Sequence, residues 1–170
     1  MADKYMTLDN GRKVTKAAAD ASAGAADAGK IVALDAAGKL AASLFPAGIG
    51  SDATVRPASE SLSAGNFVNV WDDAGTAKVR KADASAAGKE AHGYVLGAAT
   101  AGQSVTVYWD ETNSAVSGLT AGVRYYLSAT NPGQATATPP SAAGNVLQYL
   151  GTATSATELP FEPDDGVVLG

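Results

Sequence analysis

The chain of 170 residues contains no cysteine and no long apolar run. Without cysteine it has no disulfide framework, no thiolate zinc site and no thiol nucleophile, which is typical of a protein that assembles in a reducing cytosol. No apolar run approaches the roughly 18 residues of a membrane span, and the first residues lack the basic-then-apolar order of a signal peptide. We therefore expect a soluble protein that is not exported and has no membrane partner.

Bulky apolar side chains are also scarce. Alanine accounts for 37 of the 170 residues, whereas leucine, isoleucine, valine and phenylalanine together number 31, or 18% of the chain. Chains below roughly 20% are often disordered, but a net charge of −5 is too small for that class. A lean core instead indicates that contacts with other subunits, or with a larger surface, complete the structure.

Basic residues are sparse in the longer part of the chain. Residues 1–50 carry six basic and five acidic side chains, whereas residues 51–170 carry six basic and twelve acidic ones. Nucleic-acid binding depends on lysines and arginines that neutralise phosphates, so no nucleic-acid partner is expected. The change in composition predicts an extended N-terminal arm of residues 1–50 and a domain of residues 51–170.

Short runs of alternating apolar and polar residues follow four Ala-Gly steps. These runs are residues 64–71, 101–109, 121–127 and 143–150. A period of two with β-branched and aromatic residues is typical of half-buried strands, and glycine permits the turns between them. No helical period competes with this pattern. We predict an all-β fold, a small β-sandwich or barrel, with hairpins at 67–81 and 93–109 and the longest strand at 145–155.

The arm is predicted to contain two small hairpins. Residues 4–15 form strands around an Asn10-Gly11 turn, and residues 31–41 form strands around an Asp-Ala-Ala-Gly turn. The alanine- and glycine-rich residues 17–29 between them are expected to be flexible or ordered by a partner. A hairpin this small exposes its apolar side chains unless another subunit or a host surface covers them.

Candidate catalytic and metal-binding residues are few. His92 is the single histidine, which without cysteine is too little for a typical zinc site. The acidic pairs at 72–73, 110–111 and 164–165 lie outside any D-x-D-x-D-G calcium loop, and no glycine-rich phosphate-binding motif occurs. The sequence predicts no catalytic residue, no metal site and no cofactor. Adventitious calcium binding and a catalytic carboxylate pair are the alternatives.

Aromatic residues are concentrated in the predicted strands. We expect those strands to bury them in the core or at the interface of a trimer, and a sugar- or peptide-binding platform is the alternative. The residues assigned to the core or the trimer interface are Trp71, Trp109, Tyr125, Tyr126 and Tyr149.

Two segments resemble virion proteins of tailed bacteriophages. Residues 28–46 read AGKIVALDAAGKLAASLFP, similar to a GK-apolar-x-x-L-D-x-x-GKL-D-x-S-x-x-P stretch of trimeric fibre and head-decoration proteins, with Ala41 where aspartate is common. Residues 118–161 contain GLTAG, YYLS, PG, TPP, G-x-V-x-Q-x-x-G and L-x-F in the order found in the C-terminal β-module of those proteins. Residues 63–70 and 93–99 are similar to strands of small capsid cement proteins.

The resemblance implies a non-enzymatic capsid decoration, or cement, protein. Such a protein forms a homotrimer on the exterior of the virion capsid after assembly in the host cytoplasm, and it clamps neighbouring major capsid protein subunits. Residues 1–50 would bind the capsid, and residues 51–170 would surround the trimer axis. The anchors that we expect to be buried against the capsid are Ile31, Val32, Leu34, Leu40, Leu44 and Phe45.

Two other functions fit parts of the sequence. One is a short head, collar or tail fibre whose β-domain binds a host surface glycan through its aromatic residues. The other is a hydrolase or lyase module, which would require paired carboxylates in one pocket.

Overall fold

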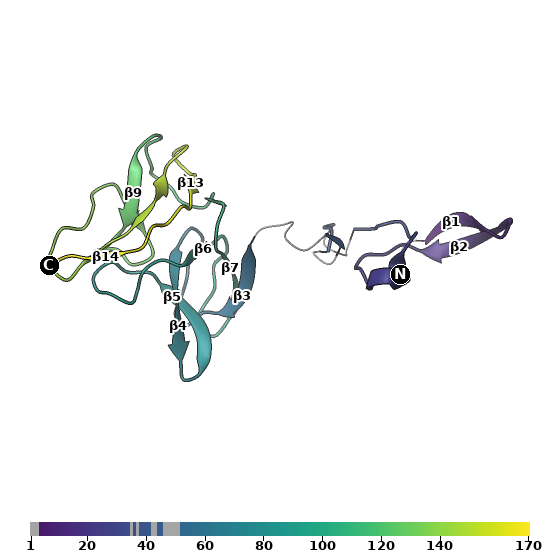
Figure 1. Cartoon of the computed structure of the whole chain (residues 1–170), viewed down its shortest axis with the longest axis horizontal. Helices are drawn as coiled ribbons and strands as arrows, with labels where there is room; N and C mark the ends of the chain where they lie inside the picture. Colours follow the sequence, from purple (N-terminus) through teal and green to yellow (C-terminus); the bar gives the residue numbers. More distant parts are fainter. Residues whose placement is uncertain (1–3, 35, 37, 42–43, 46–51) are drawn as a thin grey trace. The chain divides into compact units, whose positions relative to one another are not determined.

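The computed structural model describes residues 4–34, 36, 38–41, 44–45 and 52–170, and the chain is all-β, as predicted (Figure 1). By its internal contacts it divides into an N-terminal unit, Met1–Gly50, and a C-terminal unit, Ser51–Gly170. Among the described residues, no helix has the length and hydropathy needed to span a bilayer. Residues Gly24–Asp27 form the short 3-10 turn η1.

The described residues of the N-terminal unit form one hairpin. Strand β1 (Lys4–Asp9) pairs with β2 (Arg12–Ala17) across the predicted Asn10-Gly11 turn, where both residues have positive φ. The second predicted hairpin, at 31–41, is wrong for the residues that the structure describes there, which form no strand. Instead, Val32 makes an isolated parallel bridge with Ala19. Asp35 and Ala37, in the predicted turn, lie outside the described residues.

The C-terminal unit contains twelve strands. They are β3 (Ala53–Pro57), β4 (Phe67–Asp73), β5 (Thr76–Lys81), β6 (Gly93–Val95), β7 (Ser104–Tyr108), β8 (Thr112–Asn113), β9 (Arg124–Leu127), β10 (Ala135–Thr136), β11 (Val146–Leu147), β12 (Tyr149–Thr152), β13 (Leu159–Pro160) and β14 (Val167–Val168). The largest sheet has five strands in the order β3-β7-β6-β4-β5, and its neighbouring strands are all antiparallel. The smaller sheets are β10-β9-β12, β11-β14 and β13-β8.

The five-stranded sheet curls until its two edges meet. Directly after β3, Ala58 forms a parallel bridge with Val79 of β5, and the Ser59 amide donates to the Val79 carbonyl at 2.8 Å. The sheet therefore closes at this point as a small barrel.

Two hydrophobic clusters lie on opposite faces of this sheet. Val68 and Val95 point into the barrel interior with other valines, whereas their neighbours Phe67 and Tyr94 point outward. The outward cluster is completed by β9, β12 and β13, whose buried residues include Leu150. Both clusters belong to the C-terminal unit.

Three strand boundaries differ from the prediction. The β4–β5 hairpin turns at Ala74 and Gly75 alone, so its strands are longer than expected. Strand β6 ends at Val95 and not at residue 99. The long strand predicted at 145–155 is divided at Gln148 into β11, which pairs with β14, and β12, which pairs with β9 and contains a bulge between Tyr149 and Gly151.

Gly65 provides a test of the packing between the barrel and the following loops. Its φ is +84°, and an added methyl group would overlap the backbone oxygen of Ala115. Gly102 has the same φ of +84° but open space around it. We expect Gly65→Ala to lower the free energy of unfolding by roughly 3 kcal/mol or more, against about 1 kcal/mol for Gly102→Ala. Urea denaturation measures both variants, and equal losses would contradict the close contact at Gly65.

Candidate functional site

The predicted capsid anchors are exposed or half-buried residues of the N-terminal unit. Ile31, Val32, Leu34, Leu40 and Phe45 are between 42% and 58% exposed, and Leu44 is half-buried. Among the described residues of this unit, Ala19 is the single buried hydrophobic residue. The unit therefore presents most of its apolar side chains to solvent.

Backbone hydrogen bonds hold the first three anchors in place. The Ala19 amide donates to the Ile31 carbonyl and the Ala33 amide donates to the Ala19 carbonyl, both at 2.9 Å. Before this bridge, the Lys30 ammonium lies 2.6 Å from the Asp27 carboxylate. The Lys30 hydrogen bond lowers the pKa of Asp27, and the same contact raises the pKa of Lys30. This ion pair is exposed and adds little stability. The two backbone hydrogen bonds of Ala19 therefore contribute most to holding residues 31–33 in place.

Sequence reasoning missed two apolar residues of the first hairpin. Met6 and Leu8 are 69% and 68% exposed on one face of β1, and with Lys13 they line a shallow hollow of about 210 Å³. Their alternation with Tyr5 and Thr7 could have identified this face, because residues i and i+2 of a strand point to the same side. The exposed apolar surface thus extends beyond residues 31–45.

The two tryptophans are half-buried parts of the barrel wall. The Trp71 indole nitrogen donates to Ser59 Oγ at 3.1 Å, and the Arg80 guanidinium lies 4.9 Å from the Trp71 ring centre. The Trp109 indole nitrogen donates to Thr54 Oγ1 at 3.0 Å. These contacts fix both rings within one subunit, and their role at a trimer interface stays a prediction.

The three predicted tyrosines differ in burial. Tyr125 is a core residue that is 5% exposed, and its hydroxyl accepts a hydrogen bond from the Thr120 amide at 2.9 Å. Tyr126 and Tyr149 are half-buried on the opposite face of the small sheet, where their ring centres are 6.0 Å apart. Together with Arg124 and Asp164 they line a hollow of about 260 Å³. The structure therefore places Tyr126 and Tyr149 in one accessible site.

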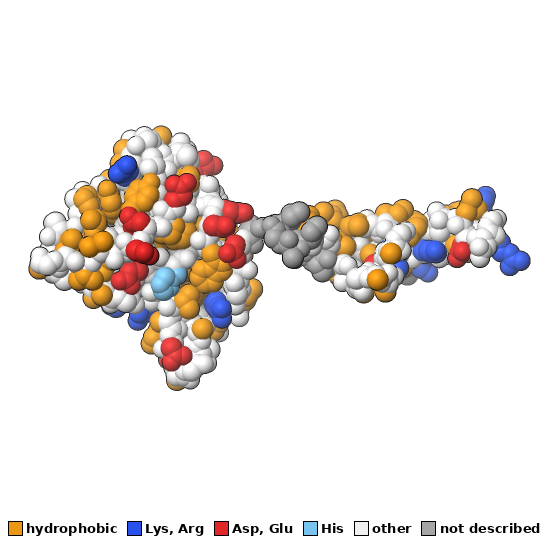
Figure 2. All heavy atoms as spheres, in the orientation of Figure 1, with side chains coloured by type: hydrophobic (Ala, Val, Ile, Leu, Met, Phe, Trp, Pro, Cys, Tyr) orange, Lys and Arg blue, Asp and Glu red, His pale blue; other side chains and the backbone are white. Residues whose placement is uncertain are grey.

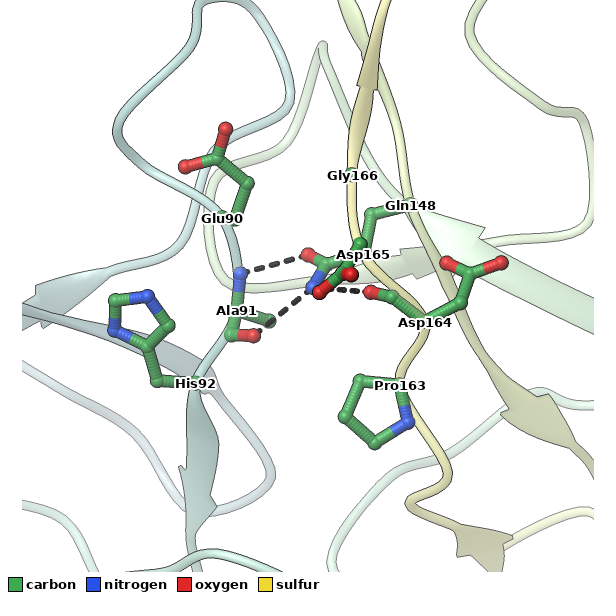
Figure 3. Close-up of a pocket in the computed structure, with 8 residues that line it drawn as sticks. All are labelled: Glu90, Ala91, His92, Gln148, Pro163, Asp164, Asp165 and Gly166. Atoms are coloured by element: carbon green, nitrogen blue, oxygen red, sulfur yellow. Dashed lines mark hydrogen bonds between the residues drawn. The ribbon is translucent and has the colours of Figure 1, made fainter.

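A larger hollow of about 470 Å³ lies beside Asp164 (Figure 3). Glu90 and His92 stand on one side, and Asp164 and Asp165 stand on the other. Between them the buried Gln148 amide accepts a hydrogen bond from the Ala91 nitrogen at 2.7 Å. Its NH2 group also donates to the backbone carbonyl of Ala91 at 3.0 Å and to the backbone carbonyl of Asp164 at 3.3 Å. This amide holds the two sides of the hollow together.

Besides Gln148, two side chains of this hollow each have one atom that is hydrogen-bonded to the backbone. His92 Nδ1 accepts a hydrogen bond from the Val70 amide at 3.1 Å, and Asp164 Oδ1 accepts one from the Tyr149 amide at 2.8 Å. The part of the chain that the structure describes holds no group of three or more histidine, aspartate or glutamate residues arranged for a metal ion. The contacts support the strand edges, and the predicted absence of catalysis stays a prediction.

Tyr94 shows the strongest electrostatic perturbation. Its ring is buried, and its hydroxyl donates to the Asp110 carbonyl at 3.0 Å. Burial, the nearby carboxylates of Glu111 and Asp110, and Tyr108 raise the pKa of Tyr94 to about 12. The phenol is therefore held neutral within the core and is unavailable as a binding platform.

Comparisons with known proteins give no relative for this chain. No family model, curated protein or solved structure matches it. The functional argument therefore rests on the residues and their geometry.

The pKa of Tyr94 predicts a pH dependence of folding. An unfolded tyrosine ionises near pH 10, whereas the folded Tyr94 does so at about 12. The stability is unaffected below pH 10, and it is lost as the pH rises from about 10 to about 12, because the unfolded chain releases its proton first. We expect Tyr94→Phe to make this decline shallower. Urea unfolding at a series of alkaline pH values measures it, and identical slopes in both proteins would contradict the assignment.

Proposed function

We propose that this protein decorates the exterior of a tailed-bacteriophage head, where it binds the assembled major capsid protein as a homotrimer and stabilises the shell without catalysis. The observation that carries the proposal is the contrast between the two units. The described residues of the N-terminal unit bury Ala19 alone among their hydrophobic side chains, whereas the C-terminal unit has two buried clusters. The first unit is therefore suited to attachment, and the second is suited to independent folding.

The exposed anchors supply the attachment energy. Full burial of a leucine, isoleucine, valine or phenylalanine side chain is worth roughly 1.5 to 3 kcal/mol, and association consumes part of that gain through lost motion. Five of the anchors are 42–58% exposed and can bury this surface against the capsid. The gain from their burial exceeds the cost of association, so each arm is attracted to the capsid. Three arms on one trimer strengthen this attraction, since each later arm binds at a high effective concentration.

The C-terminal unit is suited to face the solvent. Residues 51–170 carry twelve acidic and six basic side chains, and Figure 2 shows acidic side chains spread over the visible face of this unit. Such a surface favours solubility. A protein that binds the assembled shell, and not its separated subunits, stabilises the shell by mass action. This mechanism requires no reacting group.

Replacement of one anchor tests whether the N-terminal unit, and not the C-terminal unit, binds the capsid. Leu34 and Val55 are 58% and 62% exposed, the first in the N-terminal unit and the second on β3. We expect Leu34→Asp to weaken binding to purified expanded capsids of the parent phage by at least about tenfold, because a carboxylate would be buried in the contact. The matched control, Val55→Asp, should bind like the unchanged protein. Co-sedimentation measures binding, and thermal unfolding checks that both variants stay folded.

Three outcomes would contradict the proposal. One is full capsid binding by Leu34→Asp together with full binding by a chain that lacks residues 1–46. Another is monomeric protein on the capsid, as shown by cross-linking. The third is a location at one vertex or on the tail in electron micrographs of labelled virions, which would favour the fibre alternative.

A further inference from the structure

The outer face of the β10-β9-β12 sheet carries an aromatic pair. Along β9, Tyr125 and Leu127 point into the core, so Arg124 and Tyr126 point to the opposite face. Tyr149 of β12 is the register partner of Tyr126. The two rings meet edge to face, with an interplanar angle of 69°, and together they form a fixed aromatic surface.

Further contacts hold this surface in place. The Tyr149 hydroxyl is hydrogen-bonded to Thr152 Oγ1 at 2.8 Å, and the Arg124 guanidinium lies 5.9 Å from the Tyr149 ring centre. A tyrosine supplies a large contact area at a low cost in conformational entropy, because it has two rotatable side-chain bonds. The pair is therefore preorganised for a ligand that combines apolar and polar surfaces.

Two charged side chains, Arg124 and Asp164, line the hollow together with the rings. Within the residues that the structure describes, the Arg124 guanidinium takes part in no ion pair, and its N–H groups are donors. Asp164 holds the Tyr149 amide through Oδ1, so its Oδ2 is left as an acceptor. The hollow between these groups measures about 260 Å³, just below the roughly 300 to 1,000 Å³ of sites for drug-sized molecules.

We propose that this hollow binds one neutral hexopyranose unit of a glycan. The C–H face of the sugar packs on Tyr126 and Tyr149, and its hydroxyl groups accept from Arg124 and donate to Asp164. The charges of Arg124 and Asp164 balance within the hollow, and the neighbouring Glu90 and Asp165, with the six-residue acidic excess of residues 51–170, disfavour an acidic sugar. This activity is separate from capsid attachment, which the N-terminal unit carries.

The neighbouring hollow offers room for a second sugar unit of the glycan. Asp164 lines both cavities, and the larger one, of about 470 Å³, offers Glu90, His92 and Asp165 as additional polar groups (Figure 3). A second sugar unit linked to the first would extend past Asp164 into this space. We therefore expect a disaccharide to bind more tightly than its monosaccharide.

Titration of the full-length protein with sugars tests the proposal. The probes are glucose, galactose, mannose and N-acetylglucosamine, the disaccharides maltose and lactose, and glucuronic acid as the acidic comparison. Amide NMR signals report binding. We expect at least one neutral sugar to shift the signals of Arg124, Tyr126, Tyr149 and Asp164 in a saturable manner, and glucuronic acid to bind at least about tenfold more weakly.

Three variants make the titration specific. Tyr149→Ala should weaken binding about tenfold, and Arg124→Ala, at an exposed position, should weaken it without altering the fold. Tyr5→Ala removes a tyrosine of the N-terminal unit and should leave binding unchanged. Capsid co-sedimentation of Arg124→Ala should equal that of the parent protein, so that failure of this proposal is distinguishable from failure of the decoration function.

Several results would overturn the saccharide site. They are the absence of any shift at Tyr126 and Tyr149 with all neutral sugars, equal or tighter binding of glucuronic acid, and unchanged binding by both Arg124→Ala and Tyr149→Ala. A change of native mass in Tyr149→Ala would also overturn it, because the face would then be a contact between subunits.

Discussion

The buried amide of Gln148 is the interaction on which the C-terminal unit most depends. It is 3% exposed and satisfies both the amide and the carbonyl of Ala91, in the way that a neighbouring strand would. Its third contact, with the Asp164 carbonyl, brings the C-terminal tail to the same point. Each of these groups would cost about 1 to 3 kcal/mol if buried without a partner. Both hollows beside Asp164 are therefore supported by one side chain.

Bulky apolar side chains are equally scarce in the two units, with 9 among residues 1–50 and 22 among residues 51–170, but the units differ in how they bury them. The C-terminal unit compensates through backbone closure, since the contact between Ala58 and Val79 completes a barrel whose interior is filled largely by valines. The N-terminal unit has no comparable cluster among its described residues, and Met6 and Leu8 add to its exposed apolar surface. The exposed large hydrophobic side chains are therefore found mainly among the described residues of the N-terminal unit.

The sequence predicted local structure better than long-range contacts. The alternating residues of β4 and β7 and the Asn10-Gly11 turn were sufficient for the all-β fold, because strand periodicity is local. The strand expected at 145–155 was interrupted, since Gln148 serves Ala91 while Tyr149 begins a new pairing. The proximity of Tyr126 to Tyr149 depends on the register of β9 with β12, and that of His92 to Asp165 depends on the path of the tail. Neither arrangement is encoded in residue spacing.

The pairing of β3 with β7 has a consequence for synthesis. Val55 lies opposite Thr106, so the barrel cannot close until about fifty further residues have left the ribosome. During that interval the exposed apolar side chains that precede β3, such as Ile31, Val32 and Leu34, have already left the ribosome, with no partner to cover them. Lys30 and Lys39 lie close to these side chains in the sequence, and charges beside an apolar stretch keep newly made chains from adhering to one another.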